Sequence, residues 1–203
     1  FVVPGLLELD EIEAICQEIT RVIDQYPDVP EGLIQMEPRI LSGEKQVATL
    51  EMGVRKLFQT ARHNDFFRRL AFHERMVEIA HALVGPDLLL MQSMTLMKPP
   101  HVSTEKIWHQ DNAYFKVSDP TKGTAMWVAL HDANLENGTL HVIPRSYLET
   151  YDHGRDPKSD HHIHCPVPEE RAVPIELPAG GVAFFNYGTA HSTKANLSDQ
   201  DRA

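Results

Sequence analysis

The stretch AMWVALHDANLENGTLHVI, residues 125–143, decides the fold class, because two short apolar runs lie on either side of a group of turn residues. The runs predict strands over 125–133 and 139–143, and Glu136-Asn137-Gly138 between them predicts a tight hairpin turn. Outward from this stretch, other short apolar runs predict strands over 88–97, 107–116, 173–177 and 182–187. Helices first and short strands later is the order of an α+β protein with a jelly-roll core.

The part of the chain before residue 88 has the spacing of helices. Asp10, with Glu13 three residues later, predicts a helix start of the capping-box type, and Tyr26-Pro27 ends this helix. Two more helices are expected at about 51–61 and 74–84, with loop and a short strand over 28–48. The first helix has apolar side chains along one face, at Ile12, Ile15, Ile19, Val22 and Ile23.

Length and composition indicate a single globular domain. At 203 residues, of which 42% are hydrophobic and 24% charged, the chain can bury one sizeable core. We expect a helical part over about 1–87 and a jelly-roll core over about 88–203. No apolar run approaches the roughly 20 residues of a membrane span, and the first residues lack the basic head of a signal peptide.

Charge and cysteine content exclude some classes of protein. The net charge of −10 argues against a nucleic-acid-binding surface, which needs a basic stripe. Cys16 and Cys165 lie far apart and match no disulfide framework, so we expect reduced thiols in a cytoplasmic protein, with a disulfide as the alternative. The oligomeric state stays open.

The run Trp108-His109-Gln110-Asp111-Asn112 carries the candidate chemistry. Because the side chains of a strand alternate, His109 and Asp111 are expected on one face. His191 follows after 79 residues, and ten more residues separate it from Arg202. Two imidazoles and one carboxylate form the facial triad of non-heme Fe(II) oxygenases, which leaves coordination positions open. A cation such as Arg202 suits a cosubstrate that carries a carboxylate.

The motif resembles that of the phytanoyl-CoA dioxygenase family of Fe(II)/2-oxoglutarate oxygenases. An isolated His-x-Asp occurs by chance in many proteins, and twelve histidines allow unrelated pairings. The resemblance extends, however, to FVVPGLL at 1–7, to the segment ending at Gly85, to WVAL at 127–130 and to ENGTLHVIP at 136–144. It implies a double-stranded β-helix that uses Fe(II), 2-oxoglutarate and dioxygen. It also implies a further strand after the arginine, so we expect that the chain is truncated after Ala203.

The resemblance implies roles for single residues, and for some the residues themselves favour another reading. His109, Asp111 and His191 are the implied metal ligands. Alternation points Gln110 away from the metal, although the family uses this glutamine near the cosubstrate or substrate. A core position for the tryptophan and methionine and a solvated chain end for the arginine are the alternatives to cosubstrate contacts. The residues implied at 2-oxoglutarate are Arg202, which pairs with its distal carboxylate, Thr193, Gln110, Trp127 and Met91.

The polar loop over 147–166 allows two readings. Its histidines, His153, His161, His162 and His164, suggest a second metal site, but no ligand spacing recurs, which favours a solvated lid. The loop follows the predicted hairpin, at the position where relatives carry substrate-recognition residues, so His153 is a candidate substrate contact. The chain reads Pro144-Arg145-Ser146-Tyr147 where relatives often have Pro-Gly-Ser/Thr-His, so phytanoyl-CoA is not transferred as the substrate.

These features together predict a dioxygenase that hydroxylates a small organic molecule, either a lipid-derived acid or a secondary metabolite. Related halogenases have a small residue in place of the ligand carboxylate, so Asp111 predicts hydroxylation rather than halogenation. Desaturation, ring formation or epimerisation with the same cofactors is one alternative. A non-enzymatic jelly-roll protein that binds a metal is another.

Overall fold

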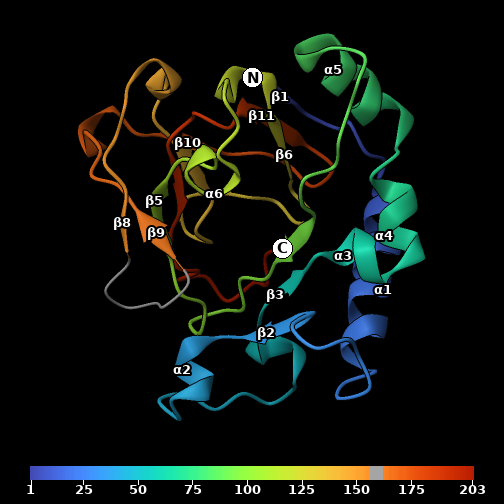
Figure 1. The fold of residues 1–203 in the computed structure, drawn as a ribbon. Helices are drawn as coiled ribbons and strands as arrows, with labels where there is room; N and C mark the ends of the chain where they lie inside the picture. Colours follow the sequence, from blue (N-terminus) through green and yellow to red (C-terminus); the bar gives the residue numbers. More distant parts are fainter. Residues whose placement is uncertain (156–161) are drawn as a thin grey trace.

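Two antiparallel sheets packed face to face form the centre of the molecule (Figure 1). The computed structural model describes residues 1–155 and 162–203. Side chains of both sheets meet in one apolar cluster, which confirms the predicted α+β class with a jelly-roll core. One sheet has the order β1 (Val2–Val3), β11 (Val182–Asn186) and β6 (Thr124–Val128). The other has the order β10 (Val173–Ile175), β7 (Leu140–Val142), β12 (His191–Thr193) and β5 (Lys106–His109).

The sequence of β11 shows how one strand serves two layers. Val182 and Phe184 belong to the apolar cluster shared with the helices, whereas Ala183 and Phe185 belong to the cluster between the two sheets. Strand side chains alternate between faces, so four consecutive apolar residues fill both layers. A buried position on both faces explains why this strand is apolar throughout.

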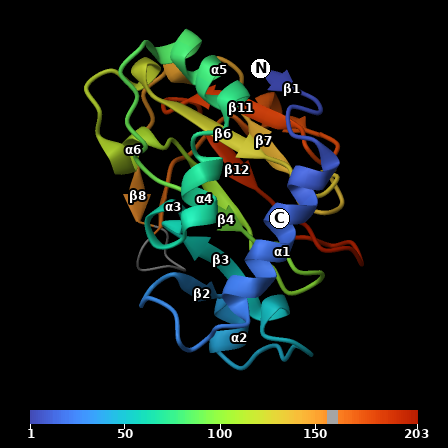
Figure 2. The same ribbon diagram turned by 90° about the vertical axis from the view of Figure 1, so that its right-hand side faces the viewer.

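Helices cover the outer face of the sheet formed by β1, β11 and β6 (Figure 2). Helix α1 (Leu9–Ile23) buries the five apolar residues predicted from their spacing. It starts earlier than expected, because the backbone N–H of Glu8 donates to the Glu11 carboxylate at 2.8 Å. The remaining helices of this part are α3 (Thr60–His63), α4 (Asp65–Leu70) and α5 (Glu74–Val84). The last of them confirms the helix predicted over 74–84.

A third sheet lies beside the jelly roll and replaces one predicted helix. It contains β2 (Ile34–Met36), β3 (Val54–Phe58) and β4 (Met94–Leu96), and α2 (Pro38–Leu41) follows β2. The helix predicted over 51–61 is wrong: a 3-10 turn at Glu51–Gly53 leads into β3. Pairing with β2 on one side and β4 on the other overrides the local helical spacing.

Several predicted strands are shorter than expected. The strand predicted over 88–97 is confined to β4, and residues 88–93 are coil. The turn at residues 136–138 exists, with Gly138 at φ +77°, but it joins β6 to β7, which lie in different sheets, so it is not a hairpin turn. Elsewhere, 3-10 turns occur at Pro120–Lys122, Ser146–Leu148 and Glu169–Arg171, and β8 (Gly154–Arg155) pairs with β9 (Ile163–His164).

Both cysteines are free thiols, as predicted; Cys165 is buried and Cys16 half-buried. None of the helices in the described part of the chain combines the length and apolar character that crossing a bilayer requires.

Candidate metal centre and cosubstrate pocket

His109 and His191 lie side by side on neighbouring strands. His109 is the last residue of β5, His191 is the first residue of β12, and the antiparallel pairing sets them opposite each other. Both side chains are buried, and their ring centroids are 4.2 Å apart. The sheet therefore joins two imidazoles that are far apart in the sequence.

Asp111 reaches the same point by a different route from the one predicted. Strand β5 ends at His109, and Asp111 has helical angles, φ −59° and ψ −31°, at the start of α6 (Asn112–Phe115). Its Oδ1 lies 3.8 Å from His109 Nε2 and 3.7 Å from His191 Nε2. The expectation that strand alternation aligns His109 with Asp111 is wrong, because a helical turn directs the carboxylate toward the imidazoles.

The hydrogen bonds of the two histidines orient them as metal ligands. Each Nδ1 lies 2.9 Å from a main-chain carbonyl, that of Ile107 for His109 and that of Thr189 for His191, so each Nδ1–H donates. In the neutral ring, Nε2 then carries a lone pair. Burial lowers the pKa of His109 well below its usual range, and the positive charges of His191 and Lys106 add to the effect.

The donor set fits a divalent metal ion. The two Nε2 atoms and one carboxylate oxygen all lie within 4.8 Å of one another. Three acceptors that face each other repel, unless a cation lies among them. Nitrogen and carboxylate donors in this combination are those of the 2-His-1-carboxylate iron sites.

Arg202 is a buried cation with its side chain already oriented. Its backbone bridges to Lys98, and its side chain is 2% exposed. Nε donates to the carbonyl of Asn137 at 3.1 Å, and Nη2 donates to that of Gly138 at 3.0 Å. Burial lowers the pKa of Arg202 to about 10, so it remains charged at neutral pH. Within residues 1–155 and 162–203, no carboxylate forms an ion pair with it.

Two further residues predicted at the cosubstrate lie on the core strands. Trp127 belongs to β6, and its ring centroid lies 5.7 Å from the guanidinium carbon of Arg202, so the structure brings these two residues together. Thr193 ends β12, two residues after His191. Its Oγ1 is buried without a hydrogen-bond partner in the described part of the chain, which leaves a donor for a ligand.

The side chain of Gln110 is held by two main-chain carbonyls, and strand alternation does not set its direction because β5 ends at His109. Its amide donates to the carbonyl of Gly188 at 2.6 Å and to that of Ser146 at 3.4 Å. The backbone N–H of Gln110 donates to Nε2 of His153 at 3.2 Å. Burial lowers the pKa of His153. Gln110 thus fixes the ligand segment to neighbouring loops, and His153 lies against that segment.

Met91 and the loop histidines are the remaining predicted residues. Met91 lies in the coil before β4 and is 42% exposed. His161 lies outside the described residues. In the described ranges, His109, Asp111 and His191 are the one group of three or more His, Cys, Asp or Glu side chains that can hold an ion, so the other loop histidines form no second group there.

Aromatic rings next to the ligands were missed by the sequence analysis. The ring of Tyr114 packs edge-on against His109, with 5.9 Å between centroids, and Phe185 packs against His191 at 4.7 Å. Tyr114 follows Asp111 by three residues, a helical spacing that carries a signal only if α6 is recognised. Phe185 is the inward neighbour of Phe184 on β11, and alternation alone does not show which of the two faces the site.

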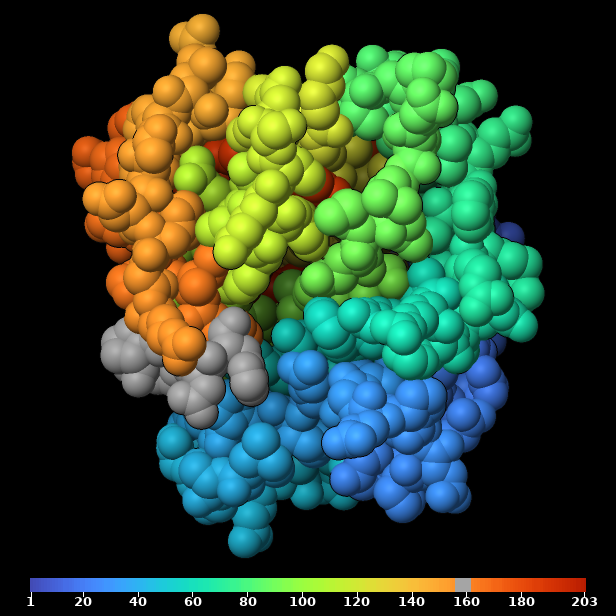
Figure 3. Space-filling view, in the orientation of Figure 1, coloured from blue at the N-terminus to red at the C-terminus, as the bar shows by residue number. Residues whose placement is uncertain are grey.

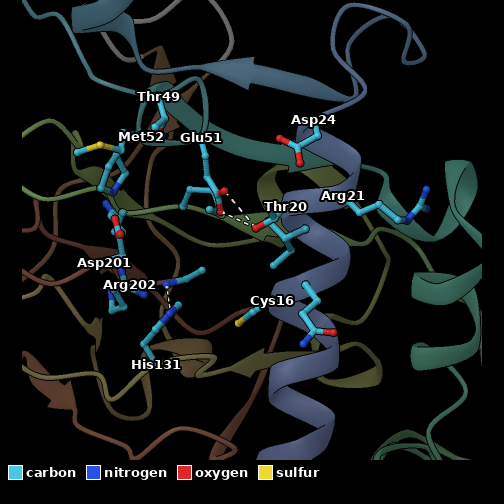
Figure 4. A pocket seen from close by; sticks show the side chains of 16 residues that line it. Cys16, Thr20, Arg21, Asp24, Thr49, Glu51, Met52, His131, Asp201 and Arg202 are labelled. Atoms are coloured by element: carbon cyan, nitrogen blue, oxygen red, sulfur yellow. Dashed lines mark hydrogen bonds between the residues drawn. The ribbon is translucent and has the colours of Figure 1, made fainter.

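Two hollows need to be distinguished. Figure 3 shows one between the yellow-green segment that contains α6 and the green segment that leads into β4. A separate cavity of about 740 Å³ lies between α1 and the last residues of the chain (Figure 4). Arg202 contributes to its wall, together with Cys16, Glu51 and His131, but none of the three ligand residues does. The metal centre and this cavity are therefore different sites.

Two histidines and an aspartate presented in this way by a jelly roll form the donor set of the 2-His-1-carboxylate iron oxygenases. The sequence matches the family model of phytanoyl-CoA dioxygenase (PhyH) over residues 1–203, and the chain belongs to this family.

Similar proteins include enzymes with different substrates. An ectoine dioxygenase from Stutzerimonas stutzeri is 24% identical, and the match covers 100% of this chain and 70% of that protein. Phytanoyl-CoA dioxygenase 1 from Oryza sativa is 29% identical over 75% of this chain, and the match spans 56% of its own length. The chain thus corresponds to only part of these relatives.

Solved structures of the same fold contain the expected cofactors. EctD from S. alaskensis with 2-oxoglutarate and 5-hydroxyectoine has a TM-score of 0.76 at 19% identity, covering 100% of this chain and 68% of that chain. The epimerase SnoN in complex with Fe3+, alpha ketoglutarate and nogalamycin RO has a TM-score of 0.71 at 26% identity, covering 99% and 74%.

Proposed function

We propose that this chain is the catalytic domain of an Fe(II)- and 2-oxoglutarate-dependent dioxygenase that hydroxylates a small organic molecule, a lipid-derived acid or a secondary metabolite. The convergence of His109, Asp111 and His191 within 4.8 Å carries the proposal. When bound, Fe(II) with 2-oxoglutarate supplies the oxidising chemistry that activates dioxygen against a C–H bond. Residues 1–87, which contain α1 to α5 and add β1 to a jelly-roll sheet, then form one domain with residues 88–203.

The three ligand residues keep the metal site ready for binding. The carbonyls of Ile107 and Thr189 accept from the Nδ1–H groups, so in the neutral rings both Nε2 atoms have a lone pair and lie within 3.8 Å of Asp111 Oδ1. Burial keeps His109 neutral at pH values where a free histidine begins to gain a proton. The carboxylate of Asp111 leaves no vacancy for a halide, which favours hydroxylation over halogenation.

Arg202 and Thr193 are the groups that we assign to the distal carboxylate of 2-oxoglutarate. A guanidinium whose Nε and Nη2 are fixed by two carbonyls presents its remaining N–H groups in a set direction. Thr193 contributes the hydroxyl that otherwise lacks a partner. Trp127 packs beside the guanidinium and keeps water from this charge, which strengthens the ion pair. We also propose His153 as a substrate contact, since it lies against the ligand segment at Gln110.

Succinate formation tests the proposal. Protein supplied with Fe(II), 2-oxoglutarate and dioxygen is expected to form succinate, and His191→Ala is expected to abolish it. His81→Ala, which changes an exposed histidine of α5, is the matched control and should keep full turnover. Equal succinate formation by His191→Ala and the unchanged protein would remove the triad from the mechanism.

A second outcome for the same site has a specific observation in its favour. The epimerase SnoN is 26% identical to this chain and has the same fold. Product analysis separates the two reactions, because hydroxylation adds one oxygen atom to the substrate, whereas epimerisation leaves its mass unchanged.

A further inference from the structure

Lys106 reaches the metal site because of an irregularity in strand pairing. Two pairs join β5 and β12: His109 with His191, and Lys106 with Thr193. The first strand therefore advances three residues while the second advances two, which is the signature of a β-bulge. In a regular strand Lys106 and His109 would point to opposite faces. The bulge removes this opposition.

The contacts of Lys106 place its charge one aromatic ring away from a ligand. Its Nζ donates to Tyr114 Oη at 2.9 Å and lies 5.2 Å from the centroid of that ring. The ring of Tyr114 also packs against the ring of His109. Tyr114 Oη also accepts from the backbone N–H of Ile163 at 3.0 Å, so the lysine, α6 and β9 meet at one atom.

The electrostatics of the site agree with this placement. Lys106 and His162 are among the positive groups that lower the pKa of His109. A divalent ion at the triad adds more positive charge nearby. An anionic ligand that approaches the triad is therefore attracted by both the ammonium group and the ion.

Exposure separates this cation from Arg202. Arg202 is buried on the chain end paired with Lys98, next to β6. Lys106 is half-buried, and Tyr114, its partner, is 39% exposed. In Figure 3, the segment containing α6 borders the hollow in this face of the molecule. Lys106 and Tyr114 are thus partly open to solvent, whereas Arg202 is enclosed.

We propose that Lys106, positioned by Tyr114, binds a carboxylate of the organic substrate and so selects for small acids. The ammonium group and the tyrosine hydroxyl supply a charge and a neighbouring polar atom, which suit the two oxygens of a carboxylate. This inference rests on the proposed function, because it takes the site to be that of an oxygenase. It makes Lys106 a substrate-specificity residue distinct from the cosubstrate residues.

Binding of model acids to the anaerobic Fe(II)–2-oxoglutarate protein tests the proposal. Hexanoate, 2-hydroxyhexanoate and benzoate are the probes, methyl hexanoate and methyl benzoate are their uncharged controls, and the visible absorption of the iron centre is the readout. At least one acid is expected to shift the band, and its ester is not. Lys106→Gln should weaken the binding of that acid by roughly tenfold to a hundredfold, which corresponds to the loss of one charge-assisted hydrogen bond.

Matched variants separate binding from structure. Lys106→Arg keeps the charge and should bind the acid within a few-fold of the unchanged protein. Lys45→Gln, at an exposed lysine, should have no effect. The midpoint for 2-oxoglutarate should be the same in all of them.

Three results overturn the proposal. One is a complete lack of acid binding by the unchanged protein across the panel, and a second is equal binding by Lys106→Gln. The third is a raised 2-oxoglutarate midpoint in Lys106→Gln, which would make Lys106 a cosubstrate residue. Failure of the proposed function is seen separately, because no band then forms with 2-oxoglutarate alone.

Discussion

Replacing Arg202 with lysine keeps the charge but removes the planar fork, and so it tests the assignment of the cosubstrate pocket. The arginine donates from Nε and Nη2 to the carbonyls of Asn137 and Gly138 and still has N–H groups for a carboxylate. A lysine has a single nitrogen on a flexible stem. It cannot hold both carbonyls and also meet the distal carboxylate of 2-oxoglutarate in a bidentate manner.

Arg202→Lys should change two free energies, that of 2-oxoglutarate binding and that of folding. Loss of one charge-assisted hydrogen bond to 2-oxoglutarate is worth about 1.5–3 kcal/mol. This corresponds to a rise in Kd of roughly tenfold to a hundredfold. A buried carbonyl left without a donor costs about 1–3 kcal/mol of folding stability. The variant should therefore lose both thermal stability and affinity for 2-oxoglutarate.

Anaerobic titration of the Fe(II)-loaded protein with 2-oxoglutarate gives the midpoint, and thermal unfolding gives the stability. Arg171→Lys is the control, since Arg171 forms an exposed pair with Glu149 at 2.9 Å, and it should change neither the midpoint nor the stability appreciably. If Arg202→Lys unfolds at a lower temperature but keeps the original midpoint, then Arg202 is structural, and the cosubstrate pocket lies elsewhere.

Three further variants test the fold and its electrostatics. Burial lowers the pKa of Lys98 to about 7, against about 10.4 in an unfolded chain. Between these pH values the unfolded state binds more protons, so the free energy of unfolding rises with pH. Lys98→Met should remove this rise, and parallel curves of stability against pH from 7 to 10 for the two proteins would contradict the assignment. Phe184→Ala should cost about 3–5 kcal/mol of unfolding free energy in a denaturant titration, because the ring is buried and stacked on Phe1, whereas Phe72→Ala, at an exposed ring, should change it by less than about 0.5 kcal/mol. Gly138→Ala should lower both stability and affinity for 2-oxoglutarate, because the new methyl group clashes with the carbonyls of residues 194 and 195 and the Gly138 carbonyl accepts from Arg202. Gly43 has a similar positive φ but open space around it, so Gly43→Ala measures the backbone cost alone. Equal losses of stability in the two variants would exclude the steric effect.

Much of the fold follows from local patterns. The apolar stripe of α1 and the boundaries of α5 match their helical spacing, since each buries one face against the sheet. The strands β7, β10 and β11 fall within the predicted ranges, and β6 begins one residue before its range. The failures occur where distant pairing decides the structure. Val54–Phe58 becomes a central strand only because β2 and β4 lie on both sides of it.

The three candidate ligands could be predicted from the sequence, but their geometry and the aromatic rings beside them could not. His109, Asp111 and His191 meet as predicted, although Asp111 lies on a helical turn rather than on a strand. Arg145 stands where relatives often have glycine, and it adopts φ +65°, a conformation that glycine adopts without strain. Lys106 lies near the metal site through a bulge, which a regular strand pattern cannot reveal.

The most direct test of the central claim is anaerobic titration of the Fe(II)-loaded protein and of Asp111→Ala with 2-oxoglutarate. We expect the visible metal-to-ligand charge-transfer band of a bidentate 2-oxoglutarate chelate in the unchanged protein. We expect none in the variant, because Asp111 closes the ligand set with His109 and His191. Absence of the band in folded, iron-loaded protein would contradict the account and leave a metal-binding jelly roll outside the 2-oxoglutarate class.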